Sequence, residues 1–230
     1  MYKYLVDYYN NILSLYELSG KDILEIGCGC GDLFKMLNGV NPNNVIGVDV
    51  APVYNHKNIL QMSAEKMLFE DEVFDFVFSV STFEHIANPL NAMNEIHRVL
   101  KPNGEMYIRF APVWTAPNGH HYNIHTGDNP IIPPWGHLYM NEDSMNIFLK
   151  EQGITNSGEI CKQIYQSEYI NRWRLSDYLT MLANMDYKFS VQLLIVNSAI
   201  QTYSQLTDFQ KSMVGKESIV SGLIARYRKN

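Results

Sequence analysis

Three glycines at alternate positions, Gly27, Gly29 and Gly31, are the residues whose spacing most clearly predicts chemistry in this chain. Glycine permits backbone conformations with positive φ and places no Cβ between the backbone and a ligand. The helix expected after the loop would offer unpaired N–H groups and a partial positive charge. Glu25 precedes the loop on an apolar strand, and Asp49 ends the next apolar strand. This arrangement predicts a nucleotide-type site in which Asp49 accepts ribose hydroxyls.

The spacing separates two kinds of nucleotide site. A dinucleotide fingerprint, G-x-G-x-x-G, would need a third glycine at position 32, where this chain has Asp32. The pattern here is E-x-G-x-G-x-G, from Glu25 to Gly31. We therefore do not expect this loop to bind a nicotinamide dinucleotide.

The glycine pattern resembles the first motif of the class I S-adenosylmethionine (SAM)-dependent methyltransferases, in particular the broad type 11 group that acts on small molecules. Later segments resemble further motifs of that family in the same order, so that the resemblance covers roughly residues 20–112: Ser63–Phe69, Asp71–Ser81, Glu84–Pro89 and Arg98–Glu105. It implies SAM as the cofactor and S-adenosylhomocysteine as the product. It also implies that Glu25 reaches the methionine ammonium group, directly or through water. The expected cofactor-binding residues are Glu25, Gly27, Cys28, Gly29, Gly31, Asp49, Val50, Ser63, Ala64, Glu65 and Ser81.

Two positions depart from the pattern of that family. Ser63 stands where the family usually has an acid that accepts a hydrogen bond from the adenine amino group, and the usual proline near Met67 is absent. Ser63 or the backbone of Ala64 is then expected to contact the adenine. Cys28 and Cys30 lie among the glycines, and we interpret them as small side chains that the turn tolerates.

Alternating strands and helices are expected to position these residues. The predicted elements are a leading helix within residues 1–19, helices near 31–39 and 89–100, and strands at Ile23–Ile26, Val45–Asp49, Asn58–Gln61, Phe74–Ser81 and Glu105–Phe110. This alternation predicts an α/β fold with a Rossmann-like, doubly wound sheet. The resembled family has about seven strands, mostly parallel, with an antiparallel last strand. Ligands bind at the carboxyl ends of such strands.

The composition changes after Phe110. Residues 112–137 hold five of the nine prolines, two of the three tryptophans and four of the seven histidines. Ordinary connections in α/β folds span about 2–6 residues, and longer loops are often functional. We interpret residues 112–140 as an acceptor-binding insertion after the fifth strand, within a single domain of residues 1–230.

Residues 141–230 are expected to form a part built from helices and a β-hairpin. The predicted helices are Glu142–Glu151, Ser167–Asn171 and Leu175–Met185, and the predicted strands are Phe189–Val196 and Ser218–Ile224.

Histidines are the candidates for acid–base chemistry, because histidine is the common general base near neutral pH. A hydroxyl acceptor needs a base or a metal as it attacks, whereas a carboxylate or thiolate needs neither. His121 is the preferred base and His120 is the next candidate. His85, which follows the fourth strand, is a third catalytic candidate, and His125 and His137 are expected to bind the acceptor.

Other interpretations of the insertion stay open. A divalent metal is a less favoured alternative, for which Asp128 and Glu142 would add oxygen ligands. Trp114 and Trp135 are expected to stack on the acceptor, or else to anchor the loop. Arg172 is a candidate for binding a phosphate or carboxylate of the acceptor, and the alternative is a solvated surface arginine.

Composition limits the class of protein. The net charge of −6 provides no general surface for phosphates, so we expect no nucleic-acid partner. No apolar run approaches the ~20 residues that span a membrane, and the N-terminus lacks the pattern of a signal peptide. Three cysteines make no disulfide framework, which favours the cytoplasm. The oligomeric state stays open.

These features together predict an enzyme that transfers a methyl group from SAM to a small polar acceptor. The preferred chemistry is O-methylation, because the insertion is rich in histidine and aromatic residues. The insertion and the Asn171-Arg172 segment that follows it also resemble methyltransferases of bacterial surface-glycan pathways, and this resemblance implies a sugar or nucleotide-sugar in surface-glycan biosynthesis as the acceptor. The alternatives are an N- or C-methyltransferase for another metabolite and a non-catalytic SAM-binding regulatory module.

Overall fold

The computed structural model describes residues 3–37, 39–51, 57–122, 131–195 and 197–230. The chain divides into two compact units. The first unit comprises Met1–Phe110, Asp186–Val191 and Ile224–Asn230, and the second comprises Ala111–Met185 and Gln192–Leu223. The second unit begins directly after Phe110, where the composition changes. No helix of the described residues is long and apolar enough to cross a membrane.

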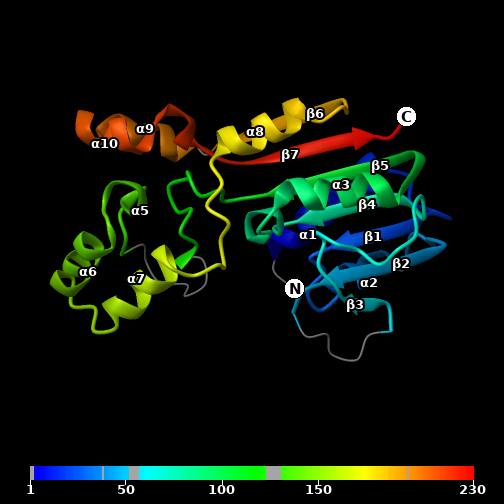
Figure 1. The fold of residues 1–230 in the computed structure, drawn as a ribbon, viewed down its shortest axis with the longest axis horizontal. Coiled ribbons are helices and arrows are strands. Elements are labelled where there is room, and N and C mark those ends of the chain that lie inside the picture. Colours follow the sequence, from blue (N-terminus) through cyan, green and yellow to red (C-terminus); the bar gives the residue numbers. More distant parts are fainter. Residues whose placement is uncertain (1–2, 38, 52–56, 123–130, 196) are drawn as a thin grey trace. The chain divides into compact units, whose positions relative to one another are not determined.

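One seven-stranded sheet has the strand order β3-β2-β1-β4-β5-β7-β6. Its strands are β1 (Asp22–Ile26), β2 (Asn44–Asp49), β3 (Ile59–Gln61), β4 (Phe74–Val80), β5 (Leu100–Phe110), β6 (Phe189–Ile195) and β7 (Val220–Arg228). The first five strands pair in parallel. In Figure 1 the arrow of β7 points opposite to those of β1 and β4. The predicted α/β sheet, mostly parallel with an antiparallel end, is confirmed.

The central strands are buried because their sequences are almost continuously apolar. β1 reads DILEI and β4 reads FDFVFSV, and Ile23, Leu24, Phe74 and Val77 are fully buried. Runs of this kind are typical of parallel strands that are covered on both faces. The parallel arrangement brings the carboxyl ends of β1, β2 and β4 to one edge of the sheet, which is the edge that carries the glycine loop.

Three helices of the first unit accompany these strands: α1 (Lys3–Leu15), α2 (Asp32–Leu37) and α3 (Pro89–Val99). Asn88 caps α3 by accepting a hydrogen bond from the backbone N–H of Asn91, and Pro89 occupies its first turn. Both features are expected at a helix start. The helix α1 packs on β4, since the ring centroids of Tyr9 and Phe78 lie 6.4 Å apart.

The second unit is mainly helical. It contains α5 (Gly136–Tyr139), α6 (Glu142–Glu151), α7 (Ser157–Tyr165), α8 (Leu175–Asn184), α9 (Asn197–Gln205) and α10 (Asp208–Val214). One apolar cluster joins Ile132 to the buried faces of α6 and α7. Another cluster surrounds Trp135, with Ala199 and Val214.

Two predicted elements were wrong. β5 begins at Leu100 rather than Glu105, because Leu100 pairs with Phe74 and a register shift then accommodates the Pro-Asn-Gly turn. Residues 167–171 form no helix. Instead α7 ends at Tyr165, and the Arg172 side chain donates hydrogen bonds to the carbonyl oxygens of Ile164 and Ser167. The two late strands exist, although β7 begins at Val220 and ends at Arg228, whereas the predicted strand was Ser218–Ile224.

Candidate functional site

The glycine loop follows β1 and takes the conformation that its sequence predicts. Gly27, Gly29 and Gly31 have φ angles of 72°, 52° and 75°. The backbone N–H groups of Gly27 and Cys28 donate to the carbonyl oxygen of Val48, at 2.8 and 3.2 Å. These bonds hold the loop against the end of β2.

Two of the glycines serve different purposes. A Cβ on Gly27 would lie 2.1 Å from Oγ1 of Thr82, so the close approach of the chain after β4 requires glycine here. A Cβ on Gly29 would meet no described atom within 4 Å, apart from its chain neighbours. Gly29 therefore presents bare backbone to open space, which suits a loop that approaches a ligand closely.

Asp49 connects the glycine loop to the turn after β2. Its Oδ2 accepts the N–H of Gly29 at 2.8 Å, and its Oδ1 accepts the N–H of Ala51 at 2.9 Å. An ionised carboxylate can accept about four hydrogen bonds, so each oxygen can also accept a ribose hydroxyl. The neighbouring Val50 is 69% exposed. The ribose assignment stays a prediction, and the geometry fits it.

Glu25 is a buried acid at the same edge of the sheet. It is 2% exposed, its Oε1 accepts a hydrogen bond from the Tyr9 hydroxyl at 3.1 Å, and its Oε2 has no hydrogen-bond partner among the described residues. Burial raises the pKa of Glu25 well above its usual value, and the carboxylates of Asp49 and Asp32 raise it further. A buried oxygen without a donor fits the expected ammonium group of the cofactor.

The loop after β3 is held by its own side chains. Oγ of Ser63 accepts the backbone N–H of Glu65 at 3.2 Å, and Oε1 of Glu65 accepts that of Asn88 at 3.2 Å. Ala64 is buried. The hydroxyl of Ser63 therefore has a local role in this turn, and its contact with adenine stays a prediction.

Ser81 and His85 follow β4. Ser81 has a φ of 53°, and its N–H donates to the carbonyl oxygen of Arg109 at 2.8 Å. His85 ends the short 3-10 helix Phe83–His85, where its backbone N–H donates to the carbonyl oxygen of Thr82 at 2.8 Å. Both residues thus lie at the edge of the first unit that carries the glycine loop.

The second unit gathers three of the four histidines of the predicted insertion. His121 is 4% exposed, and its Nε2 lies 2.8 Å from the carbonyl oxygen of Pro112. Because a carbonyl only accepts, Nε2 carries a proton. His137, on α5, donates in the same way from Nε2 to the carbonyl oxygen of Trp114 at 2.7 Å.

His120 has the opposite arrangement. Its Nδ1 accepts the N–H of Tyr122 at 3.1 Å, so the proton of the neutral ring is on Nε2. The rings of His120 and His137 are 5.1 Å apart. His120 Nε2 and His137 Nδ1 are buried, and neither has a hydrogen-bond partner among the described residues. Burial lowers the pKa of His120 to about 3 and that of His137 to about 4, so both rings are neutral near pH 7.

The aromatic and cationic candidates have packing roles here. Trp135 is fully buried, and its indole N–H donates to the carbonyl oxygen of Ser218 at 3.0 Å, so its faces contact the core and not an acceptor. Trp114 is partly buried against His137. The Arg172 guanidinium lies 5.3 Å from the centroid of Trp114, in addition to its two carbonyl contacts. His125 lies outside the described residues.

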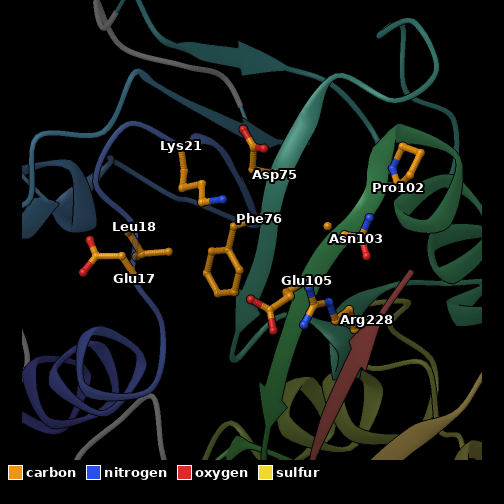
Figure 2. A pocket seen from close by; sticks show the side chains of 10 residues that line it. Glu17, Leu18, Lys21, Asp75, Phe76, Pro102, Asn103, Glu105 and Arg228 are labelled. Carbon is orange, nitrogen blue, oxygen red and sulfur yellow. The ribbon is translucent and has the colours of Figure 1, made fainter. Parts of the chain in front are cut away.

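Two other kinds of feature could form a site: a cluster of metal-binding side chains, and a cavity away from the glycine loop. Within the described part of the chain, no three His, Cys, Asp or Glu side chains are placed to hold a metal ion. A cavity of about 180 Å³ is lined by polar residues that include Lys21, Asp75 and Arg228 (Figure 2). It lies where β1 and β4 begin, at the opposite edge from the glycine loop.

Sequence reasoning missed Tyr9 and Thr82. Tyr9 lies on α1, and only the fold shows that its hydroxyl contacts Glu25. Thr82 is the second residue after β4, and its position close to the end of a strand was the available signal.

Part of the chain matches a known protein family. Residues 24–108 match the family model described as a methyltransferase domain. This part of the chain is therefore similar to a methyltransferase domain. The match begins in β1 and ends in β5, so it includes the glycine loop, Asp49 and the loop after β3.

The relatives of this chain have varied names. The chain is 37% identical over 97 residues to a demethylmenaquinone methyltransferase of Chlorobaculum tepidum, covering 37% of this chain and 39% of the relative. It is 28% identical over 113 residues to a tRNA U34 carboxymethyltransferase of Nautilia profundicola, covering 44% and 37%. The chain therefore spans less than half the length of these relatives. Other relatives are named as ubiquinone biosynthesis O-methyltransferases and sterol C-methyltransferases.

A solved structure supports the fold over the whole chain. It is a SAM-dependent methyltransferase from Mesorhizobium loti, with a TM-score of 0.58, 12% identity, and coverage of 97% of this chain and 96% of that one. The likeness at this identity concerns the fold alone.

Proposed function

We propose that this chain transfers a methyl group from SAM to a hydroxyl of a small polar acceptor, a sugar or nucleotide-sugar of surface-glycan biosynthesis. The observation that carries the methyltransferase part is the edge formed by the glycine loop, Asp49 and buried Glu25. Two features fit the cofactor: the bare backbone of Gly29, and the Oε2 of Glu25, which has no hydrogen-bond partner in the described part of the chain.

The residues of this edge would divide the cofactor between them. Asp49 would accept the ribose hydroxyls, Glu25 the methionine ammonium group, and Ser63, Ala64 and Glu65 would border the adenine. SAM, when bound, supplies an electrophilic methyl group, so the protein has to orient the acceptor and remove its proton. No metal is required for the cofactor to supply that methyl group.

The histidines of the second unit support a hydroxyl acceptor. His121 would act as the general base, and the hydrogen bond from its Nε2 to the carbonyl oxygen of Pro112 would orient its ring. His120 offers an N–H donor and His137 offers a nitrogen acceptor, and both rings are neutral. A sugar hydroxyl both donates and accepts hydrogen bonds, so a neutral donor and a neutral acceptor side by side would suit it. His85, Trp114, His125 and Arg172 remain candidates for contact with the acceptor.

The names of the relatives support two alternatives. C-methylation is one, because sterol C-methyltransferases are among the relatives. A tRNA acceptor is the other, because of the tRNA U34 relative, although the net charge of −6 favours a small molecule. A third alternative is a module that binds SAM without catalysis, and the methyl-transfer experiment described next also tests it.

The test is transfer of a radiolabelled methyl group from SAM to nucleotide sugars, quinols, sterols and tRNA, with and without chelator. Transfer to a sugar hydroxyl that survives chelation supports the proposal. Transfer to another acceptor alone contradicts the sugar assignment. Absence of transfer to every acceptor, with S-adenosylhomocysteine binding intact, favours the non-catalytic module.

A further inference from the structure

Helix α1 brings two tyrosines to the edge of the sheet that carries the glycine loop. The Tyr9 hydroxyl donates to Oε1 of Glu25, and its ring packs edge-on against Phe78, with centroids 6.4 Å apart. The guanidinium of Arg109, near the end of β5, lies 3.6 Å from the centroid of the Tyr8 ring. The helix is therefore attached at the ends of β1, β4 and β5.

The surroundings of Glu25 oppose a negative charge. Burial has the largest effect on the pKa of Glu25 and raises it, and the carboxylates of Asp49 and Asp32 also raise it. Burial raises the pKa of the nearby Cys28 thiol to about 12, so the thiol stays neutral near pH 7 and does not compensate a charge on Glu25. The hydrogen bond from Tyr9 acts in the other direction and lowers the pKa of Glu25. Glu25 therefore keeps its proton to a higher pH than an exposed glutamate, and Tyr9 opposes this effect.

We propose that Tyr9 is a positioning residue of the cofactor site and that Glu25 releases a proton to solvent when the ammonium group of the cofactor binds at Oε2. This inference rests on the SAM-dependent activity proposed above. Before binding, the carboxyl group of Glu25 is neutral and the ammonium group of the cofactor is positive. After binding, the carboxylate and the ammonium group form an ion pair, and the proton of Glu25 has passed to the solvent. The ammonium group gives Oε2 a donor, and its charge favours the carboxylate. Tyr9 fixes Oε1 and stabilises the same ionised form.

Proton release has a direct thermodynamic consequence. Affinity for S-adenosylhomocysteine, which carries the same ammonium group, should rise with pH by up to about tenfold per unit until the free carboxyl group ionises. Without the Tyr9 hydroxyl, Glu25 ionises at higher pH. In Tyr9→Phe, the pH range over which the affinity for S-adenosylhomocysteine rises should therefore lie higher than in the wild type. At any pH within or below that range, the variant should bind S-adenosylhomocysteine more weakly than the wild type does. A role in packing alone would not move this pH dependence.

Calorimetric titration of the full chain with S-adenosylhomocysteine tests the inference. Titrations in two buffers of different ionisation enthalpy, repeated across pH, count the protons released. The wild type should release up to one proton, Glu25→Gln none, and Tyr9→Phe should show the shifted pH dependence. Tyr16→Phe is the matched control, because Tyr16 directly follows α1 and its ring contacts are with Phe76 and Tyr107. This variant should behave as the wild type.

The outcomes separate the inference from the proposed function. Equal proton release by the wild type and Glu25→Gln, no release by the wild type, or an unchanged pH dependence in Tyr9→Phe each overturns the inference. Failure of the wild-type chain to bind S-adenosylhomocysteine at any pH contradicts the SAM-dependent function itself. The wild-type proton count needs no variant, so the test stands even where a variant fails to fold.

Discussion

Replacing Gly27 with alanine should lower the free energy of unfolding by much more than the same change two residues later. An alanine at the φ of 72° is strained by about 1–2 kcal/mol. Its Cβ would lie 2.1 Å from Oγ1 and 2.3 Å from Cγ2 of Thr82. Overpacking of this kind costs about 1–3 kcal/mol. The two effects together predict a loss of roughly 2–5 kcal/mol.

Gly29→Ala is the matched control for this substitution. Its φ of 52° carries similar strain, and a Cβ there meets no described atom within 4 Å beyond its chain neighbours. We therefore expect a loss of only about 1–2 kcal/mol. The added methyl group would nevertheless stand where the backbone is expected to approach the cofactor. Gly29→Ala should thus lose affinity for S-adenosylhomocysteine while it keeps most of its stability.

Urea denaturation followed by circular dichroism measures the free energy of unfolding of both variants. In a thermal scan, the melting temperature should fall by about 2–4 °C for each kcal/mol of stability lost. Thr82→Ala in the Gly27→Ala background removes Oγ1 and Cγ2, so it should recover part of the lost stability. The reasoning is refuted if Gly27→Ala is as stable as Gly29→Ala. It also fails if Thr82→Ala costs the same in both backgrounds, because the contact would then not be the cause.

Three further predictions concern the binding and histidine groups. Asp49→Ala should weaken binding of S-adenosylhomocysteine about 100-fold or more, since two hydrogen bonds to a charged group are lost. Calorimetry measures this affinity, with Asp49→Asn as the control variant. Unchanged affinity would rule out the ribose assignment. His121→Ala should leave that affinity near the wild-type value and lower turnover at least about 100-fold; undiminished methyl transfer would exclude His121 as the base. The pKa values of His120 and His137 fall on folding from 6.5 to about 3 and about 4, so unfolding takes up protons below pH 6.5. Stability should therefore fall with pH below that value, by up to about 1.4 kcal/mol per unit for each ring, and a urea series across pH should show a smaller fall for His120→Gln.

Much of the fold follows from local sequence. β1 and β4 are apolar runs that end in glycine or polar residues, and the loop spacing from Gly27 to Gly31 predicts its backbone conformation. The start of β5 was missed because Pro102 and Gly104 look like a turn, whereas pairing of Leu100 with Phe74 extends the strand beyond it. Tertiary pairing decided that boundary, and no local pattern reports it.

The site was predictable only in part. Glu25 and Asp49 were found because acids at strand ends are local signals, but the contact from Tyr9 joins residues that are distant in sequence. The histidines were found by type, whereas their ring protons depend on carbonyl and N–H partners that only the fold supplies. Trp135 shows the converse limit, because composition could not distinguish a stacking residue from a fully buried one.

The discontinuity of the first unit constrains how this chain can be cut and how it is synthesised. Lys229 exchanges backbone hydrogen bonds with Asn103 and Gly104, and Tyr227 contacts both Tyr187 and His97. A ribosome must therefore finish the whole second unit before the residues that pair beside β5 emerge. Until then β5 has an open edge, which invites pairing with other chains. A fragment that stops at Phe110 would keep that exposed edge permanently, so we expect it to aggregate although it holds the entire glycine loop.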